Sequence, residues 1–335
     1  MAKKKEGDQR LLKILLKLAL AAGIIGWLVY SGKLDFTELV IYLDKPEIIF
    51  FSIFIFAFGF VYAQSLRWRL LLKGLGVDIL AKVAMQLQMI GFFFNVAMPG
   101  AVGGDIIKAI YVSKQIGSRT KAMTSVLLDR ILGLLSLFTL TGIVSILNIE
   151  SLWPITALRP LVILIFVVLL SGFIFIGLVY WKRNSSIEDL RVFKMKIPGI
   201  AILKEIFSAF WAFIKSPRTL VISLLIGMAI QTAFGMLFYY MTYLVNGELP
   251  ALGVFAVVFP FGVLISSIPL APGGLGVGHI GFEKVFALGG ISNGANIFNV
   301  IILGQLLLNL TGAVPYLFYK SKGDELVSMD SKIST

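Results

Sequence analysis

Residues 99–103, with the sequence PGAVG, interrupt one long apolar stretch of this chain, and residues 272–276, PGGLG, interrupt another. The two breaks share a proline and two glycines at the same offsets, and they lie 173 residues apart in a chain of 335. A Pro-Gly break leaves backbone N–H and C=O groups unpaired, and lipid cannot satisfy them, so such breaks lie inside protein or beside a polar cavity. Two of them at corresponding positions in two halves indicate a binding site at the centre of a transporter-like fold.

The composition predicts an integral membrane protein. Of the residues, 58% are hydrophobic and only 14% are charged, and the mean hydropathy is +0.93, whereas soluble domains carry about 25% charged residues. The net charge of +12 is typical of a membrane protein with Lys- and Arg-rich cytoplasmic loops. We therefore expect no nucleic acid partner.

Several classes of chemistry are excluded by residue type. The chain has no cysteine, so it has no disulfide, thiol nucleophile or Cys-bound metal. His279 is the single histidine, which rules out a His-rich metal site. No P-loop motif for nucleotide phosphates occurs. We expect neither a metal nor a cofactor.

Apolar runs predict about six transmembrane helices. The first follows a basic N-terminal stretch and ends near residue 30, and we interpret it as an uncleaved helix rather than a signal peptide, because the apolar run continues past the candidate cleavage site. The remaining five lie near residues 48–66, 123–148, 160–181, 219–245 and 292–319. The span near 48–66 is predicted to stop at Arg67.

The two broken segments, residues 83–112 and 251–290, are predicted to be re-entrant helix pairs. With a cytoplasmic N-terminus this topology places 25 of the 30 basic residues on the cytoplasmic side and four outside, a strong bias of the expected sign. Both termini are then cytoplasmic, in the cytoplasmic (inner) membrane. The alternative, two full spans per segment, would place Asp105, Lys108 and Lys114 in or near the hydrocarbon, which is costly.

The chain is predicted to form one all-α integral membrane domain over residues 1–335. Residues 48–148 and 219–319 repeat the order helix, re-entrant pair, helix with opposite orientation, which is an inverted-topology repeat. Between them, residues 182–218 hold eight basic and three acidic residues and a helical apolar stripe. We interpret this segment as a cytoplasmic amphipathic helix on the anionic lipids of the inner leaflet.

Three ordered motifs resemble those of the lysylphosphatidylglycerol synthase transmembrane (flippase-like) family. They are FFNVAMPGAVGGDIIK at residues 93–108, SVLLDRILG at residues 125–133 and APGGLGV at residues 271–277. Two positions depart from the family pattern: Lys108 stands where the family more often has Arg, and Gly278-His279 stands where many members have Arg-Glu. The resemblance implies the lipid-translocating membrane region without the soluble aminoacyl-transferase domain of bifunctional members.

The residues at the first break have two interpretations each. Gly100, Gly103 and Gly104 permit a tight turn and close helix packing, or their N–H groups at a helix N-terminus hold a lipid phosphate. We expect Asp105 to cap the following helix. Lys108 either lies beside the same phosphate or snorkels to the interface.

Charged and polar residues within the other segments are further candidates. Asp129 and Arg130 are expected to face the interior, and because neighbours on a helix point about 100° apart, each needs another partner, with Asp105 a candidate for Arg130. His279 and Glu283 share a helix face and form either a proton-sensitive site or an interfacial polar pair. Three more polar side chains inside apolar spans make interhelical hydrogen bonds or line a headgroup path: Gln231, Gln305 and Asn309.

The predicted function is translocation of a phosphate-bearing or otherwise polar-headed lipid between leaflets. The alternatives are an intramembrane lipid-modifying transferase with Asp105 or Asp129 as its base, and an accessory subunit of a lipid synthase that transports nothing. Predicted partners are the lipid substrate and either a second copy of the chain or a lipid synthase. The candidate headgroup-binding residues are Asn95, Pro99, Gly100, Gly103, Gly104, Asp105, Lys108, Asp129, Arg130, Pro272, Gly273, Gly274, Gly276, His279 and Glu283.

Overall fold

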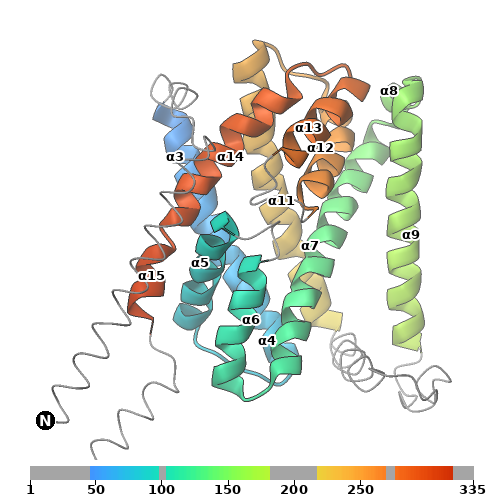
Figure 1. Cartoon of the computed structure of the whole chain (residues 1–335). Helices are drawn as coiled ribbons and strands as arrows, with labels where there is room; N and C mark the ends of the chain where they lie inside the picture. Colours follow the sequence, from blue (N-terminus) through green and yellow to red (C-terminus); the bar gives the residue numbers. More distant parts are fainter. Residues whose placement is uncertain (1–45, 98–102, 182–216, 269–275, 320–335) are drawn as a thin grey trace, which may run out of the picture.

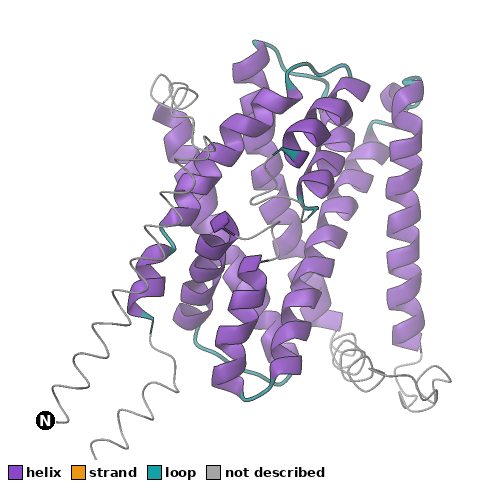
Figure 2. Cartoon of the chain, viewed as in Figure 1, coloured by secondary structure: helices purple, strands orange, loops and turns teal. Residues whose placement is uncertain are grey.

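The computed structural model describes residues 46–97, 103–181, 217–268 and 276–319. Over these residues the chain is entirely helix and connecting loop (Figure 2). The first predicted span, nearly all of the amphipathic segment 182–218, and the site candidates Pro99, Gly100, Pro272, Gly273 and Gly274 lie outside the described residues.

Within the described residues, five helical segments are long and apolar enough to cross a membrane. They are Pro46–Gly74, Arg119–Leu147, Thr156–Ile174, Pro217–Asn246 and Gly294–Phe318, and they confirm five of the six predicted spans. The protein is therefore a multi-pass membrane protein.

The first of these spans continues beyond its predicted end. It consists of α3 (Pro46–Phe54), the π-helix η2 (Ile55–Ala63) and α4 (Gln64–Gly74) without interruption. The prediction that it stops at Arg67 is wrong, because Arg67 is only 4% exposed and lies in the protein interior. The helix ends instead before Gly76, whose φ of +75° is unfavourable for other residues.

Each half of the chain contains a pair of short helices followed by a longer one. The first pair is α5 (Ala81–Ala97) and α6 (Gly103–Ile116), and the longer helix α7 (Arg119–Leu147) follows. The second pair is α12 (Leu252–Ser266) and α13 (Val277–Leu288), and α14 (Gly294–Leu310) follows. The breaks predicted near residues 99 and 272 therefore fall between the two helices of each pair.

The remaining helices connect these units. After α7 come α8 (Ile149–Leu152), the 3-10 helix η4 (Thr156–Leu158) and the long α9 (Arg159–Trp181). The second half begins with α11 (Pro217–Asn246), and α15 (Ala313–Phe318) follows α14.

The two short pairs occupy opposite halves of the bundle. Figure 1 shows α5 and α6 in the lower half of the view and α12 and α13 in the upper half. The longer helix of each half packs on its own pair and also on the pair of the other half, since α7 contacts α6 and α12, and α14 contacts α13 and α5. The halves therefore interlock around the centre of the bundle.

Glycines bring the helices of each pair close together. A Cβ on Gly104 of α6 would lie 1.8 Å from the carbonyl oxygen of Gly91 on α5. In the second pair, a Cβ on Gly281 of α13 would lie 2.5 Å from Cγ2 of Ile265 on α12. Small residues at such contacts allow the close helix approach on which packing within a membrane depends.

Candidate functional site

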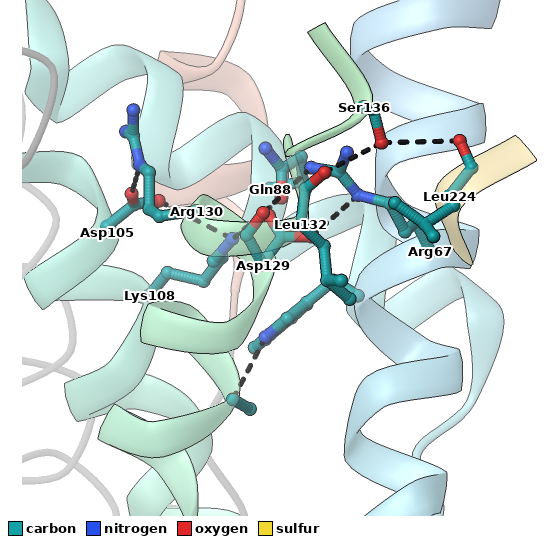
Figure 3. A network of polar contacts seen from close by, with 11 residues as sticks. Arg67, Gln88, Asp105, Lys108, Asp129, Arg130, Leu132, Ser136 and Leu224 are labelled. Carbon is teal, nitrogen blue, oxygen red and sulfur yellow. Dashed lines mark hydrogen bonds and ion pairs between the residues drawn. The ribbon is translucent and has the colours of Figure 1, made fainter. Parts of the chain in front are cut away.

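A cluster of charged side chains is buried where α4, α6 and α7 meet (Figure 3). Arg67 comes from α4, Asp105 and Lys108 come from α6, and Asp129 and Arg130 come from α7. Arg67, Lys108 and Asp129 are 4%, 1% and 3% exposed. Charged groups at this burial are stable only when they are paired and hydrogen-bonded.

Arg67 and Asp129 form the central ion pair. The Nε of Arg67 donates to Oδ1 of Asp129 at 2.9 Å, and its Nη2 donates to the Asp129 carbonyl oxygen at 3.3 Å. Asp129 was expected to face the interior with a partner other than Arg130, and this prediction is confirmed. Its partner lies 62 residues earlier in the chain.

Lys108 lies close to the carboxylates of both Asp105 and Asp129. Its Nζ lies 3.5 Å from Oδ1 of Asp105 and 4.0 Å from Oδ2 of Asp129, and it donates to Oε1 of Gln88 at 3.1 Å. The ammonium also lies 4.5 Å from the ring centroid of Trp68, within the range of a cation–π contact. The interpretation that Lys108 snorkels to the interface is wrong, because its side chain is enclosed by these partners.

Asp105 pairs with Arg130 as the sequence predicted, through Oδ2 and Nε. The Arg130 side chain is 42% exposed, so it forms the outer edge of the cluster. Asp105 does not cap α6, which begins at Gly103; it lies in the first turn, where a carboxylate is favourable near the positive end of the helix dipole. Three cations against two carboxylates leave the cluster with one net positive charge.

Gly227 of α11 makes room for the Arg67 guanidinium, and Gly133 of α7 lies beside it. A Cβ on Gly227 of α11 would lie 3.0 Å from Nη1 of Arg67 and 2.2 Å from Oγ of Ser136, and a Cβ on Gly133 of α7 would lie 3.4 Å from Nη2. Ser136 in turn donates to the Leu224 carbonyl oxygen of α11 at 3.2 Å. The slot that holds Arg67 is therefore built from both halves of the chain.

A cavity of about 230 Å³ adjoins the cluster at the centre of the bundle. Residues of both halves line it, from η2 and α4 to α14. Its apolar wall is largely phenylalanine, leucine and isoleucine. Its polar lining residues are Gln64, Arg67, Asn95, Asp129, Arg130, Gln231, Ser266, Ser267, Gln305 and Asn309.

Among the described residues, two buried oxygens of the cavity lining have no hydrogen-bond donor. Within the described residues, Oε1 of Gln64 and Oδ1 of Asn309 are buried and accept no hydrogen bond. Arg67 supplies donors to the same lining, and its hydrogen bonds to Asp129 use Nε and Nη2. Buried polar groups in native proteins are nearly always hydrogen-bonded, so this cavity presents both donors and acceptors to whatever occupies it.

The first break contributes one of its predicted residues to the cavity directly. Asn95 lines the cavity, and its Oδ1 accepts the Gly104 N–H at 2.7 Å. This bond and the contact with Gly91 give Gly104 a packing role. The Gly104 N–H is already occupied, so the phosphate-cradle hypothesis remains a prediction for the other glycines of the break.

The described candidates at the second break, Gly276, His279 and Glu283, are not among the residues that line the cavity. Nδ1 of His279 accepts the Gly276 N–H at 3.2 Å, and Nε2 lies 3.1 Å from Oδ1 of Asn299. Glu283 accepts the Ala295 N–H at 2.8 Å, at the start of α14. These bonds hold the turn and the neighbouring helix in place, with Gly276 at a φ of +81°, and His279 and Glu283 each use a different partner.

Comparison with known families identifies the chain. The model of the lysylphosphatidylglycerol synthase TM region matches residues 14–308. The chain belongs to this family. The resemblance predicted from the three motifs is thus confirmed. The lysylphosphatidylglycerol synthase TM region family is linked to the modification and flipping of membrane lipids. Comparison with curated proteins and with solved structures found no matching protein.

Several residues of the site could not be identified from the sequence pattern. The sequence pattern predicts Arg67 at the cytoplasmic end of a span because basic residues usually mark that boundary. Gln64, Gln88 and Trp68 were not singled out. One local indication was available for Arg67, namely its place directly after an apolar run long enough to continue as a helix, with Trp68 and a leucine run beyond it.

Proposed function

We propose that the protein moves a lipid with a phosphate-bearing headgroup between the two leaflets of the membrane. The observation that carries the proposal is the central cavity, which both halves line and whose lining includes the buried Arg67 guanidinium. Guanidinium is well suited to phosphate because its planar N–H groups match the phosphate oxygens. Family membership supports a role with membrane phospholipids.

The size of the cavity suits a headgroup rather than a whole lipid. Its volume of about 230 Å³ is below the roughly 300–1,000 Å³ of pockets for drug-sized ligands. A smaller apolar pocket of about 30 Å³ shares Phe60, Phe234, Ile301 and Gln305 with it and extends to Ser52 and Phe56. We infer that the acyl chains leave the cavity along this path, between α3–η2 and α14, and remain in the bilayer.

Re-entrance of the two short pairs is part of the proposal. Their helices hold 12 to 17 residues, which corresponds to about 18–26 Å at helical rise, against about 30 Å of hydrocarbon. Their location in opposite halves of the bundle supports an inverted repeat in which each pair gates one side of the membrane. Arg67 and Lys108 are buried and no longer count as cytoplasmic basic residues. The predicted topology then places 23 basic residues on the cytoplasmic side and four outside, which still supports cytoplasmic termini.

We propose transport without a chemical step. A transferase would need a carboxylate available as a base, but Asp105 is paired with Lys108 and Arg130, and Asp129 is paired with Arg67 and Lys108. Paired in this way, both carboxylates are suited to holding cations in place for an anionic headgroup.

The test is lipid exchange in liposomes that contain the purified protein and phosphatidylglycerol labelled on its headgroup. Quencher accessibility reports the leaflet, and chromatography of the extracted lipid reports any chemical change. We expect exchange without conversion, reduced at least tenfold in Arg67→Lys, which keeps the positive charge beside Asp129 but lacks the planar N–H groups of guanidinium. The matched control is Arg69→Gln, on the same helix, whose guanidinium pairs with exposed Asp78 at 3.0 Å. Conversion of the lipid with no change of leaflet would overturn the proposal.

A further inference from the structure

We propose that His279 is a proton-sensitive switch, in which protonation of the imidazole ring releases the turn at Gly276 that leads into α13. The inference concerns the second short pair and goes beyond the proposed function, since it assigns control by protons rather than a ligand of the central cavity. It follows from the hydrogen bonds of the ring, from its place in the helix and from its contact with the wall of the cavity.

The hydrogen bonds of His279 require a neutral ring in one tautomer. The backbone N–H of Gly276 can only donate, so Nδ1 of His279, 3.2 Å away, accepts and carries no hydrogen. The neutral ring then has its hydrogen on Nε2, which lies 3.1 Å from Oδ1 of Asn299 and donates to it. One ring nitrogen is therefore used as an acceptor and the other as a donor.

Protonation removes the first of these bonds and keeps the second. A proton from solvent binds the Nδ1 lone pair, because Nε2 already carries a hydrogen. Nδ1–H and the Gly276 N–H then face each other, and two donors cannot share a hydrogen bond. The bond from Nε2–H to Asn299 is unaffected. The ring therefore stays attached to α14 while Gly276, which is exposed to solvent, loses its partner.

The position of His279 in α13 makes this bond a helix cap. Gly276 is the N-cap of α13 and His279 is the third helical residue, N3, from which Glu or Gln commonly accepts the N-cap N–H. Histidine is the one side chain whose charge ordinarily changes between pH 5 and 8, so here the cap depends on pH in that range. Gly276 has a φ of +81°, and a glycine that loses its hydrogen bond can leave this conformation freely.

The helices packed around α13 bring no second sensor to the ring. Neither α12 nor α14, which both pack on α13, contains a charged residue. On α11, which meets α13 where Phe238 stacks on Phe282, the charged residue is Arg218 in the first turn. The charged residues of α13 itself are Lys284, which is exposed, and Glu283, which accepts a backbone N–H at the start of α14. Glu283 is therefore the group that a test must separate from His279.

The switch lies directly behind the wall of the central cavity. Phe298 of α14 lines the cavity, and the His279 ring meets it in a T-shaped contact at 5.0 Å and 85°. A Cβ on Gly278 would lie 2.3 Å from Cζ of Phe298, so the first turn of α13 packs tightly on this phenylalanine. Release of Gly276 frees the turn that precedes this contact. Any consequence for lipid exchange rests on the proposed function, whereas the switch itself does not.

The test observes the ring directly, because His279 is the single histidine of the chain. Protein labelled with 15N-histidine, purified with a tag that holds no histidine and placed in nanodiscs, gives ring signals from His279 alone. At pH 8 we expect the nitrogen chemical shifts of a ring with hydrogen on Nε2 only, and at pH 5.5 those of a ring with hydrogen on both nitrogens. Hydrogen exchange of a peptide that spans Gly276, corrected for the intrinsic pH dependence of exchange, should show the loss of one protected amide over the same range.

Three results would overturn the inference. The first is a ring with its hydrogen on Nδ1 at pH 8, and the second is a ring that stays neutral at pH 5.5. The third is a Gly276 amide that stays protected although the ring carries both hydrogens.

Two variants assign the response to one side chain. His279→Gln keeps an acceptor at N3 but cannot gain a charge, so the Gly276 amide should stay protected at both pH values. Glu283→Gln is the matched control, since it removes the other acid–base group of the same helix face and keeps an acceptor for the start of α14. The loss of protection at pH 5.5 should persist in this variant. A response that remains in His279→Gln, or that disappears in Glu283→Gln, would refute His279 as the sensor.

Lipid exchange in liposomes at pH 8 and pH 5.5 distinguishes failure of the inference from failure of the proposed function. If no lipid changes leaflet at either pH while the Gly276 amide responds in the wild type and not in His279→Gln, the switch stands and the transport function is refuted. If lipid changes leaflet while the Gly276 amide stays protected at both pH values, the transport function stands and the switch is refuted.

Discussion

The two halves of the molecule share an order of helices but stabilise their short pairs by different chemistry. The first pair, α5–α6, is anchored by buried ion pairs between Arg67, Asp129, Lys108 and Asp105. The second pair, α12–α13, contributes no charged residue to the described cavity lining and is held by stacked rings such as Phe282 with Phe238. The two pairs therefore share an order of helices but differ in the interactions that hold them in the bundle.

The difference has a mechanical consequence. Moving α6 would separate buried charges, which is strongly unfavourable because an unpaired charge in the interior loses its solvation without compensation. Moving α13 would only slide apolar surfaces and exchange hydrogen bonds such as the one from Ala295 N–H to Glu283. We infer that the first pair resists displacement more strongly than the second.

The largest expected effect concerns the orientation of the two halves. Ser118 precedes α7 and Ser292 lies in the loop before α14, so they occupy equivalent places after the two short pairs. Because the chain has no native cysteine, each can be replaced singly by Cys and labelled in intact cells with an impermeant maleimide. We expect all-or-none behaviour, with Ser292→Cys labelled from outside and Ser118→Cys labelled only after permeabilisation. Equal labelling of both from outside would contradict the inverted repeat.

The next effect compares the charges of the two halves. Arg67→Gln leaves Asp129 without its main partner and should lower the free energy of unfolding by about 3–5 kcal/mol, whereas Glu283→Gln in the second half should cost about 1 kcal/mol. The measurement is denaturant unfolding in detergent micelles. Replacing both charges, as Arg67→Met with Asp129→Leu, should recover much of the loss because no unpaired charge remains. If Arg67→Gln and Glu283→Gln lower the free energy of unfolding equally, the predicted difference between the two halves is wrong.

The smallest effect compares the glycine contacts. In Gly104→Ala the new methyl group meets the backbone oxygen of Gly91 at 1.8 Å, and in Gly281→Ala it meets the Ile265 side chain at 2.5 Å. Overpacking typically costs about 1–3 kcal/mol, and we expect Gly104→Ala to lie at the upper end because a backbone atom cannot rotate away. Thermal unfolding should show the larger loss for Gly104→Ala, and adding Ile265→Ala should restore Gly281→Ala only.

Much of the fold could be predicted from the sequence because the signals are local. Five spans and the positions of both breaks agree with the apolar runs and the Pro-Gly motifs. The pairing of Arg130 with Asp105 could also be predicted, because a charge inside an apolar span needs a partner of opposite charge and Asp105 lies in the segment directly before that span. The end of the first described span could not be predicted. A basic residue after an apolar run usually marks the membrane interface, whereas Arg67 is buried in the protein interior.

By itself, the sequence determined that this chain is a helical membrane protein with a broken segment in each half, because hydropathy and Pro-Gly chemistry act on neighbouring residues whatever the rest of the chain does. Only the tertiary structure decided where the charges meet. Arg67 pairs with Asp129, 62 residues away, in a slot between α7 and α11 that a side chain on Gly227 would obstruct. No local pattern encodes that slot, since its energy depends on three helices packing together around one guanidinium group.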